Sequence, residues 1–270
     1  MVMALEYGFM VNALAASILA AIACGIIGVY VVVKRIVFIS GGISHASFGG
    51  IGLGYFLGIE PVLCVIPFGI AAALVIGEVR QRTLLSEDTA IGVIWAMGMA
   101  LGIMLIALTP GYAPDLLSYL FGNILMVSRS TLWVMLALDV IILTVVWLLY
   151  KEFLAITFDE EFATVIGIPA HKLYLVLLCL IALTVVMLIR VVGVILVIAL
   201  LTIPAAASRR LTNDLRKMMG LSILFAALFS ITGLYLSYLF DLPSGSTIVL
   251  VSGVVFLLIS STSPGHSFKY

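Results

Sequence analysis

Long apolar runs separated by short polar turns follow one another along the chain. Most runs have roughly 18 to 25 residues, enough for a helix to cross the ~30 Å hydrocarbon core of a bilayer. The pattern predicts nine spans, at residues 11–33, 36–57, 62–77, 90–108, 132–150, 173–189, 191–208, 221–239 and 246–260. Residues 190–193 must serve as the whole turn between the sixth and seventh spans, so an arrangement with eight spans stays open. We therefore expect an all-α, polytopic bundle of eight to nine transmembrane helices, with residues 1–270 forming a single domain.

The composition is that of a membrane protein. Of the 270 residues, 64% are hydrophobic and only 10% are charged, whereas an average soluble domain has about 25% charged residues. The 13 basic and 13 acidic residues balance, so the net charge does not favour binding to nucleic acid. The lipid bilayer is the expected environment.

The basic residues are distributed unevenly over the predicted loops. If the first span ends in the cytoplasm, 11 of the 13 basic residues lie in cytoplasmic segments. These residues are Lys34, Arg35, Arg80, Arg82, Lys151, Lys172, Arg209, Arg210, Arg216, Lys217 and Lys269. Arg129 and Arg190 are left on the outer side. Because cytoplasmic loops are enriched in Lys and Arg, we expect a multi-pass protein of the cytoplasmic membrane with its N-terminus outside and its C-terminus inside.

The sequence motifs of nucleotide hydrolysis and proteolysis do not occur. A phosphate-binding loop needs the pattern GxxxxGK[ST], and the dipeptide Gly-Lys is absent from the chain. The patterns HExxH and GxSxG are absent as well. We therefore expect a protein that is not itself an enzyme and holds no permanently bound cofactor.

A Gly-rich span carries a histidine. In the sequence SGGISHASFGGIGLG, residues 40–54, small residues recur every four positions and continue as one helix face. This stripe consists of Gly42, Ala46, Gly50, Gly54 and Gly58. Such stripes let a neighbouring helix approach closely in lipid, so His45, which lies beside the stripe between Ser44 and Ser47, is expected to face protein. Its imidazole either ligates zinc, manganese or iron, or bonds to a serine or a carbonyl and ties helices together.

Asp139 is another ionisable residue predicted to lie at membrane depth. A carboxylate in this position is expected to face the bundle rather than lipid. There it would complete a cation site, relay protons or bond to a neighbouring helix.

The longest polar interruption, KEFLAITFDEEFATVIGIPAHK, covers residues 151–172 on the predicted cytoplasmic side. It predicts a short helix that starts near Asp159 or Glu160 and stops at Gly167 and Pro169. A soluble partner protein could bind such a helix. The alternative is that the segment is only a solvated loop. On the outer side, residues 118–128 are too short to cross and are expected to form a re-entrant or interfacial segment.

Five stretches, in this order, resemble the permeases of ABC importers for zinc, manganese and related metals. The stretches are VVVKRIVFISGGISHASFGGIGLG, LLSYLFGNILMVS, FDEEFATVIGIPA, VVGVILVIALLTIPAAASRR and DLPSGSTIVLVSG. These permeases are more distantly similar to those for vitamin B12 and siderophores, so the resemblance implies a type II ABC importer fold. It also implies a homodimer of permeases, two cytoplasmic ABC ATPase subunits that bind ATP, and an extracellular metal-binding protein.

By the same resemblance, residues 157–171 contain the coupling helix that docks into the ATPase subunit. The residues of this chain that match it are Asp159, Glu160, Glu161, Ala163 and Gly167. Ala163 and Gly167 stand in an AxxxG arrangement.

The histidine motif departs from the family pattern. Many relatives have an aspartate and a histidine four residues apart, on one helix face, where both can ligate a cation. Here His45 matches the histidine, and Gly41 stands in place of the aspartate. A replacement ligand could come from Asp139, Ser44, Ser47 or backbone carbonyls. We expect the permease of an importer for a divalent metal, zinc or manganese first. A secondary transporter coupled to protons or cations and a permease for a metal chelate or other small ligand are the alternatives.

Overall fold

Helices account for the regular structure of residues 8–110 and 122–262, which are the residues that the computed structural model describes. In this part of the chain, eight helical segments are long and apolar enough to cross a membrane. They lie in α1 (Gly8–Val33), α4 (Pro61–Arg82), α5 (Glu87–Leu108), α7 (Arg129–Leu148), α10 (Ala170–Leu211), α11 (Leu215–Phe240) and α12 (Ser244–Thr262), and α10 supplies two of them. The all-α membrane bundle predicted from the sequence is confirmed.

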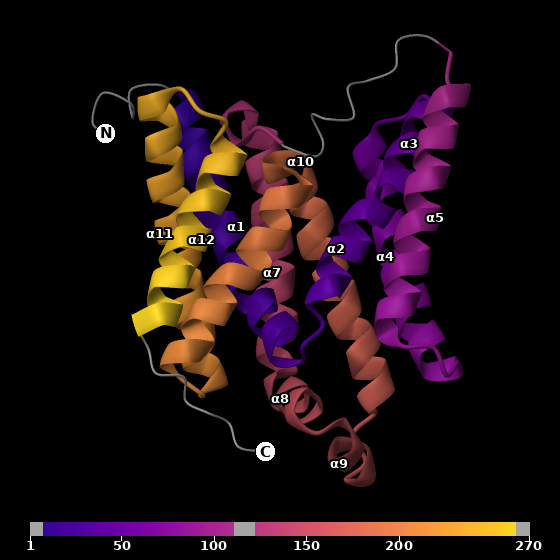
Figure 1. Cartoon of the computed structure of the whole chain (residues 1–270). Coiled ribbons are helices and arrows are strands. Elements are labelled where there is room, and N and C mark those ends of the chain that lie inside the picture. The colour runs from indigo at the N-terminus through magenta and orange to yellow at the C-terminus, as the bar shows by residue number, and fades with distance from the viewer. Residues whose placement is uncertain (1–7, 111–121, 263–270) are drawn as a thin grey trace.

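The second predicted span, residues 36–57, is not one long helix. It consists of two ten-residue helices, α2 (Val37–Ala46) and α3 (Phe48–Leu57), which meet at Ser47. The break has a local cause, because glycine weakens a helix and a serine hydroxyl that bonds to the i−4 carbonyl often bends one. The Ser47 hydroxyl donates such a bond to the carbonyl of Ile43, at 2.7 Å. The two helices follow one another through the bundle (Figure 1) in place of one long helix.

The sixth and seventh predicted spans form a hairpin within α10. Its arms, Ala170–Ile189 and Val191–Leu211, are each long enough to cross a membrane. Near the turn, Gly193 has a φ of 78° and a ψ of 161°, a conformation that favours glycine. Gly122 packs against this turn, since a Cβ on Gly122 would lie 2.8 Å from the Cα of Gly193. The sixth and seventh predicted spans are therefore both present. The structure differs from the prediction of nine long helices in the second span, where two short helices replace one long helix.

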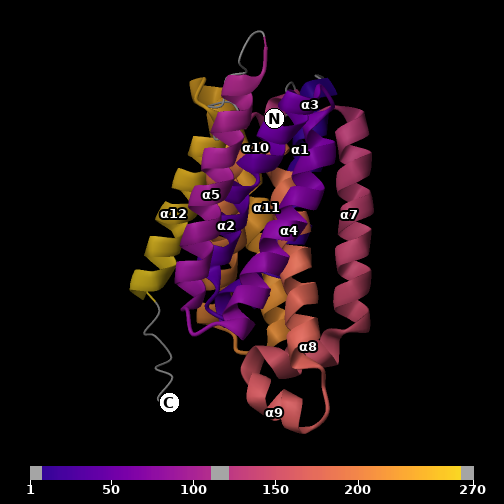
Figure 2. The same cartoon turned by 90° about the vertical axis from the view of Figure 1, so that its right-hand side faces the viewer.

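The α10 hairpin occupies the centre of the bundle. In Figure 1 it forms an inverted V, with α1, α11 and α12 on one side and α2 to α5 on the other. The helix α7 packs on α1 and α10 at the edge of the bundle (Figure 2). Small residues set close helix spacing: a Cβ on Gly25 of α1 would lie 2.6 Å from the backbone nitrogen of Ile223 in α11. In lipid, such close packing is a principal attraction between helices.

Two short helices, α8 (Tyr150–Phe158) and α9 (Glu160–Val165), lie together at one end of the bundle (Figure 1), which we call the α9 end. Tyr150, predicted as the last residue of the fifth span, instead begins α8. The reason is that the chain leaves the helical conformation at Leu149 and then buries Phe153 and Ile156 of α8. Basic residues gather at this end: Lys34, Arg35, Arg80, Arg82, Lys151, Lys172, Arg209, Arg210, Arg216 and Lys217.

At the opposite end, residues 122–128 pack across α1 and α10. They include the 3-10 turn η2 (Ile124–Met126). Asn12 of α1 donates a hydrogen bond from Nδ2 to the carbonyl of Val127, at 3.1 Å. Residues 118–121 of the predicted re-entrant segment lie outside the described residues.

Candidate functional site

His45 lies in the last turn of α2 and faces α5. Its half-buried imidazole stacks on the indole of Trp95, with ring centroids 4.2 Å apart and ring planes within 4° of parallel. The Nδ1 atom is buried and has no hydrogen-bond partner among the described residues. The imidazole therefore contacts protein, and its Nδ1 atom remains available to bind a ligand.

The hydroxyl groups of the two serines near His45 form hydrogen bonds within α2. Ser44 donates its hydroxyl hydrogen to the carbonyl of Ser40, and Ser47 donates to the carbonyl of Ile43, both at 2.7 Å. Both serines are fully buried. Their hydroxyl hydrogens satisfy backbone carbonyls, so only oxygen lone pairs remain as weak ligands.

The small residues of α2 lie against α5. A Cβ on Gly98 of α5 would lie 2.6 Å from the Cα of Ala46, and Gly42 faces the side chain of Ile91. Gly41, at the position where many relatives have aspartate, has more room. A Cβ on Gly41 would meet the Ile198 side chain at 3.5 Å, an ordinary van der Waals distance.

Beyond the break, the two stripe residues of α3, Gly50 and Gly54, lie against α4. A Cβ on Gly50 would lie 2.8 Å from the Cα of Val65, and one on Gly54 would lie 2.6 Å from the Cα of Pro61. Gly58 ends α3 with a φ of 66° and has no neighbour within 4 Å of its Cβ position. The stripe is therefore not continuous in the structure, because the break between α2 and α3 turns its two halves toward different helices.

Asp139 is buried in α7, with 2% of its surface exposed, and neither carboxylate oxygen has a hydrogen-bond partner among the described residues. It shares its buried face with Met135 and Ile142, and α7 packs on α1, where Cys24 lies within electrostatic range. His45 faces α5 instead, so the structure does not bring these two candidates together. Within residues 8–110 and 122–262, no group of three or more His, Cys, Asp or Glu side chains could hold a metal ion.

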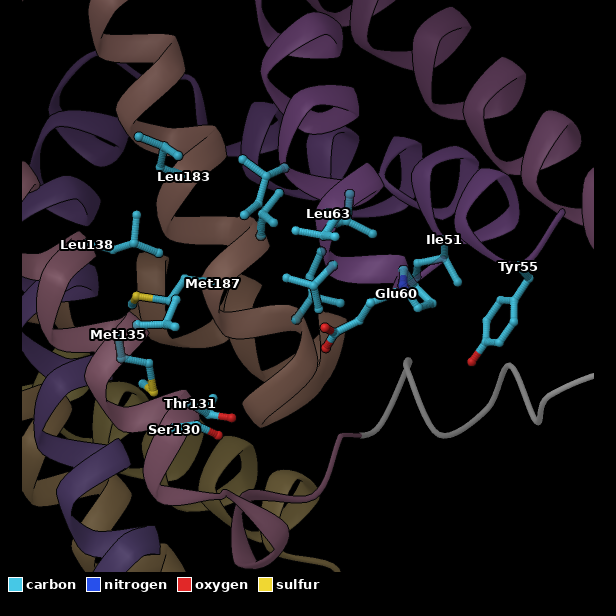
Figure 3. Close-up of a pocket in the computed structure, with 17 residues that line it drawn as sticks. Ile51, Tyr55, Glu60, Leu63, Ser130, Thr131, Met135, Leu138, Leu183 and Met187 are labelled. Atoms are coloured by element: carbon cyan, nitrogen blue, oxygen red, sulfur yellow. The ribbon is translucent and has the colours of Figure 1, made fainter. Parts of the chain in front are cut away.

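A cavity of about 530 Å³ opens between α3, α4, α7 and α10, at the end opposite α9 (Figure 3). Its wall is mostly apolar, with Ser130 and Thr131 of α7 side by side in one part of it and Glu60 in another. Glu60 was not among the residues singled out from the sequence. The available signal was its place directly before Pro61, at the start of α4, where a carboxylate faces the positive end of a helix.

At the α9 end, the candidate coupling residues build a capped helix. The Asp159 carboxylate accepts a hydrogen bond from the backbone N–H of Phe162, at 2.8 Å, and so caps α9. Ala163 is fully buried, whereas Glu161 is exposed. Gly167 has a φ of 88° and turns the chain toward α10.

Glu160 joins α9 to two transmembrane helices. Arg80, near the end of α4, donates hydrogen bonds to both carboxylate oxygens, at 3.1 and 3.4 Å. Lys34, just after α1, lies 3.6 Å from Oε2 of Glu160. Arg80 also pairs with Glu87 at 3.4 Å and lies over the ring of Tyr174, whose hydroxyl donates to Glu87. The carboxylate of Glu160 thus takes part in a network that spans α1, α4, α5 and α10.

Burial and neighbouring charges shift the pKa values of Glu160 and Lys34 in opposite directions. Burial raises the pKa of the Glu160 carboxyl, but the hydrogen bonds from Arg80 and the charge of Lys34 outweigh it, so the pKa lies below its ordinary value. Burial lowers the pKa of Lys34 more than Glu160 raises it. Lys34, with 8% of its side chain exposed, also donates to the carbonyl of Ile156 at 2.6 Å, in the last turn of α8.

Large apolar side chains are exposed on and beside α9. The exposed fractions are 65% for Phe158, 58% for Phe162, 84% for Val165 and 53% for Ile166. These four residues lie within residues 158–166, and we call them the α9 apolar surface. An apolar surface at a polar end of the molecule indicates a site of protein contact.

Comparison with known proteins gives consistent matches along the chain. A family model described as "ABC 3 transport family" matches residues 6–263. The membrane protein slr2045 of Synechocystis sp. is 50% identical over 96% of this chain and 92% of its own. The manganese transport system membrane protein MntC of Listeria innocua is 38% identical over 98% of this chain and 95% of its own. The solved structure of PsaBC from Streptococcus pneumoniae in complex with Fab matches with a TM-score of 0.85 and 33% identity, over 96% of this chain and 93% of that chain.

Proposed function

Because the chain belongs to the ABC 3 transport family, we propose that it is the membrane-spanning permease of an ATP-driven importer for a divalent metal ion, with manganese as the first candidate cargo. The observation that carries this proposal is the similarity to MntC, which extends over nearly the whole chain. ATP is then bound and hydrolysed by a separate subunit. This division of labour agrees with a sequence that has no phosphate-binding loop.

We propose His45 as a ligand of the cargo during transport. A neutral imidazole nitrogen suits manganese and zinc, and Nδ1 of His45 has no partner among the described residues. Ser44 and Ser47 are weaker candidates because their hydroxyl hydrogens bond to α2. Asp139 is also weaker, since its helix packs on α1 whereas His45 faces α5.

The cavity between α3, α4, α7 and α10 is our candidate for the outer approach to this path. Ile51 and Tyr55 of α3 line it, so the cavity adjoins the same span that carries His45. The Glu60 carboxylate in its wall supplies a charge that attracts cations.

The α9 end is our candidate for the cytoplasmic face, because the basic residues of the loops gather there. This orientation puts the start of α1 outside and the end of α12 inside, in the cytoplasmic membrane. The α9 apolar surface would then dock into an ABC ATPase subunit, with Asp159 and Glu160 fixing the helix and Ala163 and Gly167 shaping its turn. Glu161, which is exposed, would lie at the edge of the contact.

The complete importer would contain two copies of this permease, two ATPase subunits and an extracellular metal-binding protein. Family membership supports this assembly. ATP binding on the partner would supply the free-energy difference that moves the permease between outward-open and inward-open states. A secondary transporter with a His45–Asp139 relay has less support, because these two side chains face different helices.

The test is uptake of radioactive manganese into proteoliposomes that contain the permease, its ATPase subunit and the metal-binding protein. We expect uptake that requires ATP and falls at least tenfold in His45→Ala. Phe38→Ala is the matched control, because Phe38 lies on the same helix and is 67% exposed. Uptake driven by an ion gradient without ATP would contradict the importer. Wild-type uptake by His45→Ala would remove His45 from the path.

A further inference from the structure

The imidazole of His45 is oriented by an aromatic stack. Its partner Trp95, on α5, lies face to face with it at 4.2 Å. The indole is itself held, because its Nε1–H donates to the sulfur of Met99 at 3.0 Å, one turn further along α5. Phe48, at the start of α3, adds a second ring at 6.4 Å and within 18° of parallel.

This arrangement differs from the usual support of a metal-binding histidine. Such a histidine normally donates its second ring N–H to a carboxylate or a carbonyl, which fixes the ring plane. For His45, no described residue bonds to Nδ1, and the hydroxyl hydrogens of Ser44 and Ser47 are directed to backbone carbonyls. The flat contact with Trp95 at 4.2 Å is therefore the main interaction that orients the ring plane, with Phe48 more distant at 6.4 Å.

The indole also favours the loaded state of the histidine. An imidazole that coordinates a divalent cation carries part of the positive charge, and the face of tryptophan attracts positive charge more strongly than the faces of other aromatic rings. The contact therefore becomes more favourable when the metal binds. Such a difference between the free and bound states is what raises affinity.

We propose that Trp95 is a positioning residue for metal transport: it holds the imidazole of His45 in a fixed plane and strengthens its binding of a divalent cation. The proposal rests on the proposed function, in which His45 is a ligand of the cargo. Trp95 acts through His45 and needs no contact with the ion. Met99 supports it by anchoring the indole.

The first measurement is the affinity of the full-length permease for manganese chloride, by isothermal titration calorimetry. We expect Trp95→Leu to raise the Kd about 2- to 30-fold, the range that a partly desolvated cation–π contact supplies. Trp95→Phe, which keeps an aromatic face, should recover part of this loss. Trp133→Leu is the matched control, because Trp133 is 71% exposed on α7. In uptake assays, Trp95→Leu should raise KM and leave the maximal rate nearly unchanged.

A spectroscopic signature tests the contact directly. In a Trp133→Phe, Trp147→Phe background, Trp95 is the remaining tryptophan of the chain. Paramagnetic manganese bound at His45 should quench its fluorescence with a saturable dependence on concentration, whereas magnesium chloride at equal concentration should not. Absence of saturable quenching would refute manganese binding beside Trp95, whereas the KM effect and the recovery by Trp95→Phe separate a positioning role from a purely structural one.

The outcomes separate this inference from the proposed function. If His45→Ala loses manganese binding while folded Trp95→Leu keeps the wild-type Kd, the role of Trp95 is refuted and the role of His45 stands. If His45→Ala binds as the wild type does, both roles are refuted. If Trp95→Leu does not fold, Trp95→Phe decides: a Kd raised about 2- to 5-fold supports the proposal, and an unchanged Kd refutes it.

Discussion

Replacing Glu160 by glutamine should loosen α9 from the transmembrane helices. The substitution keeps the volume of the side chain but removes the charge that holds Arg80 and Lys34. Two charge-assisted hydrogen bonds from Arg80 and a 3.6 Å ion pair with Lys34 are weakened. Hydrogen bonds to charged groups contribute about 1.5–3 kcal/mol. With 29% of Glu160 and 35% of Arg80 exposed, solvent screens part of this, and about 1–2 kcal/mol is our estimate for the loss.

The assay is amide hydrogen exchange of α9 in the isolated permease, in detergent or nanodiscs. A loss of about 1–2 kcal/mol raises the population of undocked α9 roughly 5- to 30-fold, and exchange should accelerate by the same factor. Glu161→Gln is the matched control, since it removes the same charge from an exposed position on the same helix. Equal exchange in Glu160→Gln and in the wild type would refute the reasoning. In the assembled importer, we expect Glu160→Gln to lower the number of manganese ions moved per ATP hydrolysed.

The same ion pairs give a pH dependence. Because the pKa of Glu160 in the folded chain lies below its ordinary value of 4.5, the contribution of its charge is fully present above that value. It is lost as the pH falls through the lower, folded pKa. After correction for intrinsic exchange rates, protection of α9 should therefore be constant from neutral pH to about pH 5 and decline below it. Glu160→Gln should show no such decline.

Three further predictions concern the membrane-spanning part. Gly41→Asp would place a carboxylate one turn before His45, where the structure has room. It should lower the Kd for manganese, measured by calorimetry, at least tenfold. An unchanged Kd would show that position 41 does not face the ion. Gly98→Ala should lower the Tm in detergent, because its Cβ would lie 2.6 Å from backbone atoms of α2. Overpacking of this kind lowers the free energy of unfolding by about 1–3 kcal/mol. Gly92→Ala on the same helix meets no neighbour within 4 Å and should raise the Tm through its better helix propensity; equal shifts in both would refute the packing argument. Asp139→Leu should keep or raise the Tm, since both carboxylate oxygens lack partners among the described residues; a drop of many degrees would reveal a partner that those residues do not supply.

Local features of the fold could be predicted from the sequence. The length of each apolar run sets whether it can cross a bilayer, so the ends of the spans outside the second one were found to within six residues. The short connection at residues 190–193 predicted the hairpin that α10 forms at Gly193. Asp159 before a run of helical residues, with Gly167 after it, predicted the short helix α9. Each of these features depends on residues that are close together in the chain.

The break at Ser47 was not predicted, although its cause is also local. The glycines of residues 40–54 were read as a face for helix packing, and the same glycines weaken the helix that would carry the face. The second span is stabilised instead by contacts of its two halves with α5 and α4. These contacts connect residues far apart in sequence.

The sequence by itself determined which residues are apolar, which turns are short, and that a histidine and a carboxylate lie within apolar runs. Only the tertiary structure decided what these side chains face: His45 lies on Trp95, fifty positions away in the chain, and Asp139 lies toward α1. It likewise decided that Glu160 of α9 joins Lys34 and Arg80. The physical reason is that a helical repeat fixes which residues share a face, whereas packing against other helices fixes which neighbour that face meets.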